Sequence, residues 1–457
     1  MKKKFLKIIA GIACLGALVS VTTACDFFAT DPDGRTTYDV AVSNGFEGSK
    51  ESWLAQVEGA STKERQWYEE ARAAGEFEGT FAEFLQAIGA AGSESSVAAN
   101  TALRSSVSIY SFFHSSYMIG SGVIFSLDKA VGDAYILTNY HCVYSASEKT
   151  ISDKINLYLY GSEDPANANA YSTGNICATY VGGAENYDIA VLKISNVSAL
   201  RETEEHSVFM REITSGDSNA VTVGESVLAV GNAIGKGITV TKGVVSVARE
   251  EVVTHTTDGT RRITIPEIRT DAAINHGNSG GGLFNMNGEL VGIVNARLEN
   301  TTQEGATEGE NRVAGFGYAI PANLALGLAK SIVDNEGTCF TATLGLEYLT
   351  TPEETFFDEM TNKFYTEERI IIHTTLNMGG VGYASGLRNG DTLISATPVY
   401  EDETLGRTVI LTQKHKLDEL LLNVRLNDTV RFVVSRSGET LTFDVKFVSN
   451  GHFSEIL

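Results

Sequence analysis

Gly277-Asn-Ser279-Gly-Gly281 sets a serine in a turn rich in glycine, and the residues that accompany this turn decide the fold. Serine is a weak nucleophile at neutral pH, so peptide hydrolysis needs an imidazole as base, a carboxylate to orient the imidazole, and donors for the oxyanion. A histidine follows an apolar run in Thr138-Asn-Tyr-His141-Cys142, and an aspartate precedes one in Asp188-Ile-Ala-Val-Leu192. The order along the chain is histidine, aspartate, serine.

This order separates two folds. The same glycine-serine turn fits the G-x-S-x-G nucleophile elbow of α/β-hydrolases, in which the serine precedes both the acid and the histidine. Only His373, His415 and His452 follow Ser279, and no helical run comes directly after it. An α/β-hydrolase esterase is therefore the weaker alternative.

Short β-type runs surround the three candidate residues. They are separated by glycine and polar turns from Ser105 onward, and a helix is expected from Ala322 to Val333, after Pro321. Regularly spaced short strands predict barrels or a sandwich. The sequence thus predicts a mainly β domain over residues 103–335.

Seven motifs in this region resemble those of the bacterial high-temperature-requirement (HtrA/Deg) proteases, a trypsin-like family with a C-terminal PDZ domain. They are Gly120–Ile124, Ile136–Asn139, Asp188–Lys193, Val227–Asn232, Thr270–Asn275, Gly277–Gly281 and Gly317–Pro321. The resemblance implies two six-stranded barrels with the catalytic site between them, and it implies a homotrimer.

The resemblance also assigns roles to the candidate residues. Ser279 would attack the scissile carbonyl, His141 would take and return the proton, and Asp188 would hold the imidazole tautomer. The backbone N–H groups of Gly277 and Ser279 would form the oxyanion hole, a contribution of about 3–4 kcal/mol per donor. The function implied is that of an endopeptidase that cleaves unfolded or exported proteins, and a catalytically inactive surface binding protein is the alternative.

Three positions near Ser279 bear on the shape of the nucleophile loop and on substrate specificity. His276 and Gly282 each stand where the family usually has proline, which should loosen the nucleophile loop. Ala273, six residues before Ser279, would line the base of the specificity pocket. Because Ala273 carries no charge, we expect a preference for small or medium aliphatic side chains.

Residues 342–449 resemble a PDZ domain, with Ala384–Ile394, a helix from Lys416 to Asn423 and two late strand-like runs. Such domains add an extended peptide to a sheet edge and hold its terminal carboxylate with backbone N–H groups. Here these would be the N–H groups of Leu344, Gly345 and Leu346, and the partners would be C-terminal peptides. A β domain with only a packing role is the alternative.

The N-terminus predicts export. Residues 1–24 combine lysines, an apolar run and small residues before Cys25, as in a bacterial lipoprotein signal peptide, although Thr22 departs from the usual leucine. Cys25 would carry the lipid and anchor the protein to the membrane. An uncleaved signal anchor is the alternative, because an apolar stretch of about 20 residues can span a bilayer.

Residues 25–100 predict a helical repeat and linker. Tyr38–Leu54 and Tyr68–Leu85 share their pattern, and Ala90–Asn100 has linker composition. The repeat resembles short modules in surface proteins of Gram-positive bacteria. We therefore expect an extracytoplasmic lipoprotein at the cell membrane of such a bacterium, with a plain stalk as the alternative role of the repeat.

Composition excludes several classes of function. The net charge of −22 becomes −26 when residues 1–24 and their four lysines are removed, and such an acidic surface repels nucleic acid. Cys142, Cys177 and Cys339 remain besides Cys25, so no disulfide framework is expected, and a Cys142–Cys177 pair stays open. The sequence contains no metal-ligand spacing and no phosphate-cradling loop, so no metal or cofactor is predicted.

Overall fold

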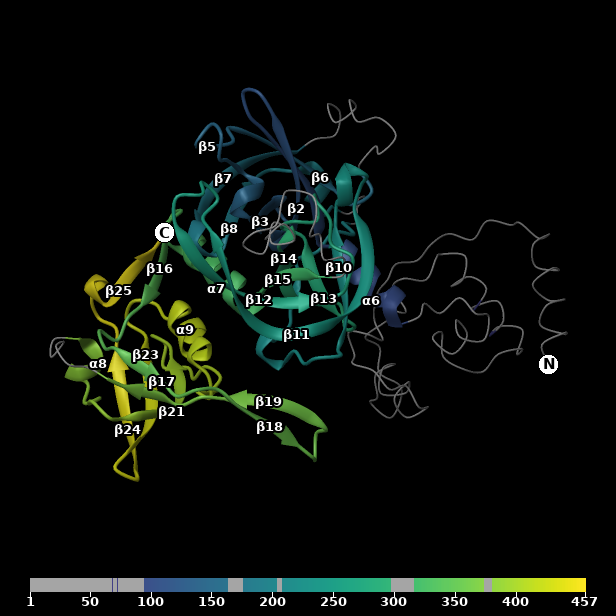
Figure 1. The fold of residues 1–457 in the computed structure, drawn as a ribbon. Helices are drawn as coiled ribbons and strands as arrows, with labels where there is room; N and C mark the ends of the chain where they lie inside the picture. The colour runs from purple at the N-terminus through teal and green to yellow at the C-terminus, as the bar shows by residue number, and fades with distance from the viewer. Residues whose placement is uncertain are drawn as a thin grey trace, which may run out of the picture. The chain divides into compact units, whose positions relative to one another are not determined.

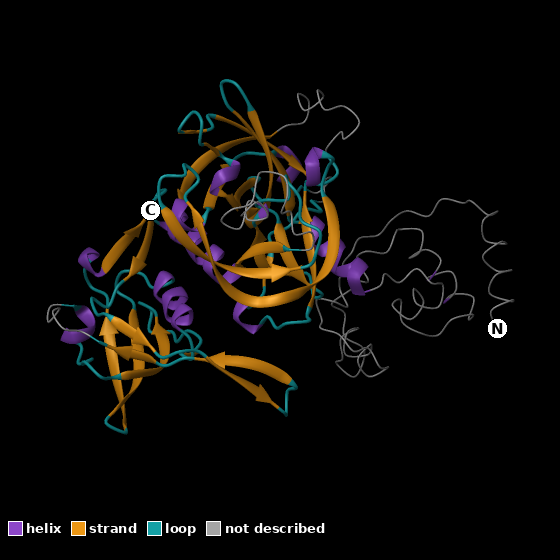
Figure 2. Ribbon diagram, viewed as in Figure 1, coloured by secondary structure: helices purple, strands orange, loops and turns teal. Residues whose placement is uncertain are grey.

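The computed structural model describes residues 68, 72, 94–162, 176–203, 208–296, 316–373 and 380–457. The chain divides into two compact units, Met1–Gly92 and Ser93–Leu457. The predicted signal peptide, Cys25 and nearly all of the predicted repeat lie outside the described residues. The second unit holds the elements that position the candidate site, and Figures 1 and 2 show its predominance of strands.

Six strands form a closed antiparallel barrel in the order β1-β2-β3-β8-β7-β6. Its interior is filled by fully buried aliphatic side chains, among them Ile109, Ile136 and Leu192. The strands are β1 (Ser106–Phe112), β2 (Tyr117–Asp128), β3 (Asp133–Asn139), β6 (Lys154–Leu159), β7 (Ile176–Ala184) and β8 (Ile189–Ile194), and β4 (Tyr144–Ser145) pairs with β5 (Thr150–Ile151).

A second barrel follows in the order β13-β10-β11-β12-β15-β14, and it is closed because β13 also pairs with β14. Its strands are β10 (Ser226–Gly231), β11 (Thr239–His255), β12 (Arg262–Thr270), β13 (Gly282–Asn285), β14 (Glu289–Val294) and β15 (Gly317–Pro321), with short β9 (Thr214–Ser215) parallel to β14. The predicted double barrel is confirmed.

Two helices accompany the second barrel. Helix α7 (Ala322–Asp334) begins directly after Pro321, as predicted. Helix α6 (Glu94–Leu103) replaces the second half of the expected linker, so the linker prediction is wrong there. The reason is burial, because Ala98 and Ala102 pack into the core shared by the barrels and their small size lets the helix approach closely.

The C-terminal region forms a separate sheet with its own core, in the order β17-β20-β21-β23-β24. The strands are β17 (Tyr348–Thr350), β20 (Ile370–Ile372), β21 (Thr392–Val399), β23 (Thr429–Arg436) and β24 (Glu439–Lys446), with β22 (Val409–Ile410) beside β21 and helices α8 (Val381–Ala384) and α9 (Lys414–Leu422). Helix α9 is close to the predicted Lys416–Asn423.

Two further strand pairs flank this sheet. Strand β16 (Cys339–Ala342) pairs with the last strand, β25 (Phe453–Ile456). Strands β18 (Glu354–Asp358) and β19 (Lys363–Glu367) form a hairpin that extends from the sheet in Figure 1, and aromatic pairs such as Phe357 and Phe364 line it.

Candidate active site

The histidine and aspartate turns emerge side by side from paired strands of the first barrel. Strand β3 pairs with β8, and the last pair in register is Asn139 with Ile189. His141 lies in the short 3-10 helix η2 (Tyr140–Cys142), which follows β3. Asp188 lies immediately before β8, so the strand register brings the two turns together.

Hydrogen bonds fix the aspartate turn against the histidine turn. The carbonyl oxygen of Asp188 accepts from the backbone N–H of Tyr140 and from Nδ2 of Asn139, each at 3.0 Å. Asp188 itself adopts the left-handed conformation, with φ of 54°. This conformation costs free energy for a residue other than glycine, and the surrounding hydrogen bonds offset that cost.

Asp188 contacts His141 through both of its carboxylate oxygens. Oδ2 lies 2.6 Å from Nδ1 of the ring, and Oδ1 accepts the backbone N–H of His141 at 2.9 Å. The Asp188 side chain is fully buried, whereas 19% of the His141 side chain is exposed. In its neutral form the ring therefore has a fixed tautomer, with the proton on Nδ1 and Nε2 as the base.

Two opposing effects set the pKa of His141. Burial of the ring lowers this pKa, but the charge of Asp188 and its hydrogen bond more than compensate and raise it above the usual 6.5, to about 10. An imidazole beside a buried carboxylate is thus a strong proton acceptor.

Ser279 reaches the same place from the second barrel. Its carbonyl oxygen accepts the N–H of Ser121 on β2 at 2.8 Å and contacts Sγ of Cys142 at 3.5 Å, which places the serine beside the histidine turn. Its hydroxyl oxygen accepts the N–H of Ala296 at 3.2 Å. Within the described ranges, no hydrogen bond joins this hydroxyl to His141.

The loop before Ser279 presents two backbone donors. Gly277 has φ of +95°, and a Cβ there would collide with the carbonyl oxygen of Asn232. The carbonyl of His276 accepts from the N–H of Ile234 at 2.8 Å, and that of Gly277 accepts from Oγ of Ser121 at 2.7 Å. Both carbonyl groups are thereby occupied by these donors. The N–H groups of Gly277 and Ser279 donate to no described group.

The two positions at which the family usually has proline, 276 and 282, have different surroundings. His276 is exposed and lies in the loop. Gly282 begins β13, where it pairs with Val230 on one side and Ile293 on the other. The expected loosening is therefore not observed at Gly282, because two strand ladders hold it.

The other predicted site residues lie in separate places. Ala273 is exposed, and its carbonyl oxygen accepts from Oγ1 of Thr241 on β11 at 2.8 Å. Leu344, Gly345 and Leu346 form a turn before β17, and the N–H of Gly345 already donates to Oγ1 of Thr343 at 3.1 Å. That donor is used inside the protein, so the three N–H groups are not equally available.

Sequence reasoning missed the residue that connects the two barrels at this site. Oγ of Ser121 donates to the carbonyl of Gly277 and accepts the N–H of Asn232, both at 2.7 Å. Ser121 lies inside the Gly120–Ile124 motif, so a signal was present, but a motif alone does not show which groups its side chain joins.

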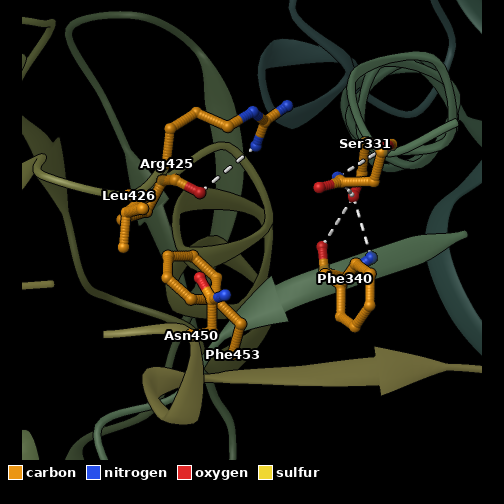
Figure 3. A pocket seen from close by; sticks show the side chains of 8 residues that line it. Ser331, Phe340, Arg425, Leu426, Asn450 and Phe453 are labelled. Atoms are coloured by element: carbon orange, nitrogen blue, oxygen red, sulfur yellow. Dashed lines mark hydrogen bonds between the residues drawn. The ribbon is translucent and has the colours of Figure 1, made fainter. Parts of the chain in front are cut away.

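A pocket of about 220 Å³ lies elsewhere, between the end of α7, β16 and β25. Figure 3 shows Ser331, Phe340, Arg425 and Phe453 around it. It shares no lining residue with the predicted catalytic site.

Three further observations bear on the site's chemistry. Cys142, Cys177 and Cys339 are free, so no Cys142–Cys177 disulfide forms. The described residues contain no cluster of side chains able to hold a metal ion. Among their helices, none is long and apolar enough to span a membrane.

Comparisons with known proteins define the class and then the family. Residues 120–293 match the family model of the trypsin-like peptidase domain. The serine protease Do-like HtrA of Lactococcus lactis subsp. lactis is 31% identical over 72% of this chain and 70% of its own length, and that of Bacillus subtilis is 32% identical over 72% and 63%. A solved HtrA-type protease, AlgW with a tripeptide, aligns with 24% identity, 76% and 95% coverage and a TM-score of 0.43. The chain belongs to the HtrA family of Do-like serine proteases, and it is a serine endopeptidase.

Proposed function

We propose that the chain cleaves unfolded or exported proteins with His141, Asp188 and Ser279 as its catalytic triad. The observation that carries this proposal is the buried pair of Asp188 and His141, whose 2.6 Å contact leaves Nε2 of the ring directed away from the carboxylate. A buried carboxylate with an imidazole in this arrangement orients and strengthens a general base.

The mechanism follows from these positions. Nε2 of His141 takes the proton of Ser279 as the hydroxyl attacks the scissile carbonyl, and it later returns a proton to the leaving amine. The N–H groups of Gly277 and Ser279 receive the developing oxyanion. The positive φ of Gly277 supports this role, because it turns the preceding carbonyl towards Ile234.

The hydroxyl of Ser279 is bonded to Ala296 and not to His141, as it would also be in an inactive binding protein. Catalytic hydrogen bonds are often long or absent without substrate and form only in the complex, so this geometry is compatible with an active enzyme. A measurement of the reaction tests the triad directly.

Degradation of casein provides that measurement. Wild type should cleave casein and react covalently with a fluorophosphonate at Ser279, while Ser279→Ala should do neither and His141→Ala should lose nearly all reactivity. Ser126→Ala is a matched control, because Ser126 lies half-buried on β2, the strand that also carries Ser121, and forms none of the contacts described for the site. Equal behaviour of wild type and Ser279→Ala, with both folded, would reject the protease triad.

The C-terminal sheet is proposed to be a PDZ domain that binds C-terminal peptides. Strand β17 is an edge strand, and Leu349 on it is 52% exposed, so the edge can accept an added strand. A labelled peptide with a free carboxylate should bind, whereas the same peptide with an amidated end should bind much more weakly. Equal binding would reject carboxylate recognition by the Leu344–Leu346 turn.

Export and anchoring complete the proposal. Lipid at Cys25 would hold the protease at the outer face of the bacterial cell membrane, and the chain would assemble as a homotrimer. Labelling of growing bacteria with a fatty acid analogue should mark wild type and spare Cys25→Ser, which should also leave the membrane fraction. Retention of the label would show that another residue carries the lipid.

A further inference from the structure

A buried carboxyl group whose charge interacts with that of Asp188 takes no part in the mechanism described above. Glu267 on β12 is fully buried, and its Oε1 accepts Nδ2 of Asn295 at 3.0 Å. Oε2 of Glu267 and Oδ1 of Asn295 find no donor among the described residues. Both of these oxygen atoms are hydrogen-bond acceptors. A proton on Oε2 that is donated to Oδ1 would therefore give each of them a hydrogen bond.

Acidic residues on two other segments act on Glu267. Asp188 lies in the turn before β8, Glu250 on β11 is the register partner of Glu267, and Glu251, which is exposed, follows Glu250. Arg249 on β11 pairs with Glu419, and Arg269 on β12 pairs with Glu250. Among the described residues, none forms an ion pair with Glu267.

Burial and these acidic neighbours favour the neutral form. Burial raises the pKa of Glu267 well above its usual range, the hydrogen bond from Asn295 opposes this rise, and the charges of Asp188, Glu250 and Glu251 add to it. A charged Glu267 would also add a second buried negative charge to that of Asp188, which is itself fully buried.

Asn295 connects this carboxyl group to the nucleophile. Its backbone N–H donates to the carbonyl of Tyr318 at 2.8 Å, and the next N–H, that of Ala296, donates to Oγ of Ser279 at 3.2 Å. Whatever fixes the side chain of Asn295 therefore also fixes the segment against which Ser279 rests.

We propose that Glu267 is a positioning residue for the triad, held as a neutral carboxylic acid that donates its proton to Oδ1 of Asn295. The resulting acid–amide pair fixes residues 295–296 beside Ser279 and keeps a second charge away from Asp188. Glu267 touches no reacting atom. Its role in catalysis rests on the proposed triad, but its neutral state does not.

The neutral state is tested by thermal unfolding as a function of pH in a Ser279→Ala background, which prevents self-digestion. A group with a raised folded pKa contributes stability below its unfolded pKa and loses it as pH rises through the folded value. Glu267→Gln keeps the shape and the paired amide but cannot ionise. The melting temperature of the Glu267→Gln protein should therefore rise relative to that of the Glu267 protein as pH increases. Parallel curves would overturn the proposal.

The positioning role is tested by the pH profile of fluorophosphonate labelling. Glu267→Gln should stay within about threefold of wild type near neutral pH and should retain its rate further into the alkaline range. Glu267→Ala, which leaves Asn295 unpaired, should be slower by about ten- to a hundredfold. Equal losses in both variants would overturn the positioning role. If no protein is labelled while the melting curves diverge as expected, the triad proposal fails and the neutral carboxyl stands.

Discussion

The hydroxyl oxygen of Ser279 accepts a hydrogen bond of 3.2 Å from the backbone N–H of Ala296, and the described part of the chain contains none from Ser279 to the ring of His141. This relationship describes a resting nucleophile. For attack, the hydroxyl must donate its proton to Nε2 of His141, a hydrogen bond that this resting arrangement lacks.

Removal of the hydroxyl should therefore expose the Ala296 amide. In Ser279→Ala, we expect faster hydrogen exchange at Ala296, because its N–H no longer has an acceptor, with a loss of stability of about 0.5–1.5 kcal/mol. The amide of Val294, which donates to the carbonyl of Gly281, is the internal control and should stay unchanged. Unchanged exchange at Ala296 would show that the bond is not populated in solution.

The pH dependence of labelling should report the His141–Asp188 pair. Because Asp188 raises the pKa of His141 above 6.5, the neutral base appears only at higher pH. The rate of fluorophosphonate labelling should thus rise with pH through a midpoint above 6.5. A midpoint at or below 6.5 would contradict the assigned effect of Asp188.

Asp188→Asn supplies the complementary measurement. Without the carboxylate charge, burial dominates and should lower the pKa of His141 below 6.5, as followed by NMR titration of the ring. The labelling rate should fall by up to about 10⁴-fold, since the amide also favours the wrong tautomer. If the pKa of the His141 ring were the same in Asp188→Asn as in wild type, the Asp188 carboxylate would not be what raises it.

The double barrel and the meeting of His141 with Asp188 could be predicted because they follow from local signals. Strand-like runs precede one residue and follow the other, and pairing of these strands puts both turns at one end of the barrel. Helix α7 could be predicted for a similar reason, because Pro321 marks the start of the helix and the apolar residues after it recur with helical periodicity.

Contacts between distant segments could not be predicted in this way. Helix α6 has linker-like composition, and its burial of Ala98, Ala102 and Leu103 in the core is a tertiary contact that composition does not indicate. The pair of Glu267 and Asn295 joins strand β12 to the segment directly after β14, and neither residue type alone indicates it. The Ser121 hydroxyl likewise acquires its role only from the approach of the second barrel.

Ser121→Ala should impair the site without touching the triad. The change leaves the N–H of Asn232 and the carbonyl of Gly277 without their buried partner, at a cost of about 1–3 kcal/mol. We expect a lower melting temperature. We also expect the rate of casein cleavage to fall by more than the decrease in the folded fraction of the protein can explain. Ser126→Ala on the same strand should change neither, and an active Ser121→Ala protein would show that the loop needs no such support.

Gly277→Ala should separate folding from oxyanion stabilisation. At φ of +95° the new Cβ would collide with the carbonyl of Asn232, so the loop must shift and its N–H must leave the oxyanion position. Loss of one such donor lowers kcat by about 10²–10³-fold. Gly224→Ala is the matched control, because Gly224 has φ of +86° but open space around a Cβ. It carries the same backbone strain, so it should lose stability and keep its kcat. If both variants lost kcat equally, strain in the barrel would explain the effect, and the Gly277 N–H would have no special role.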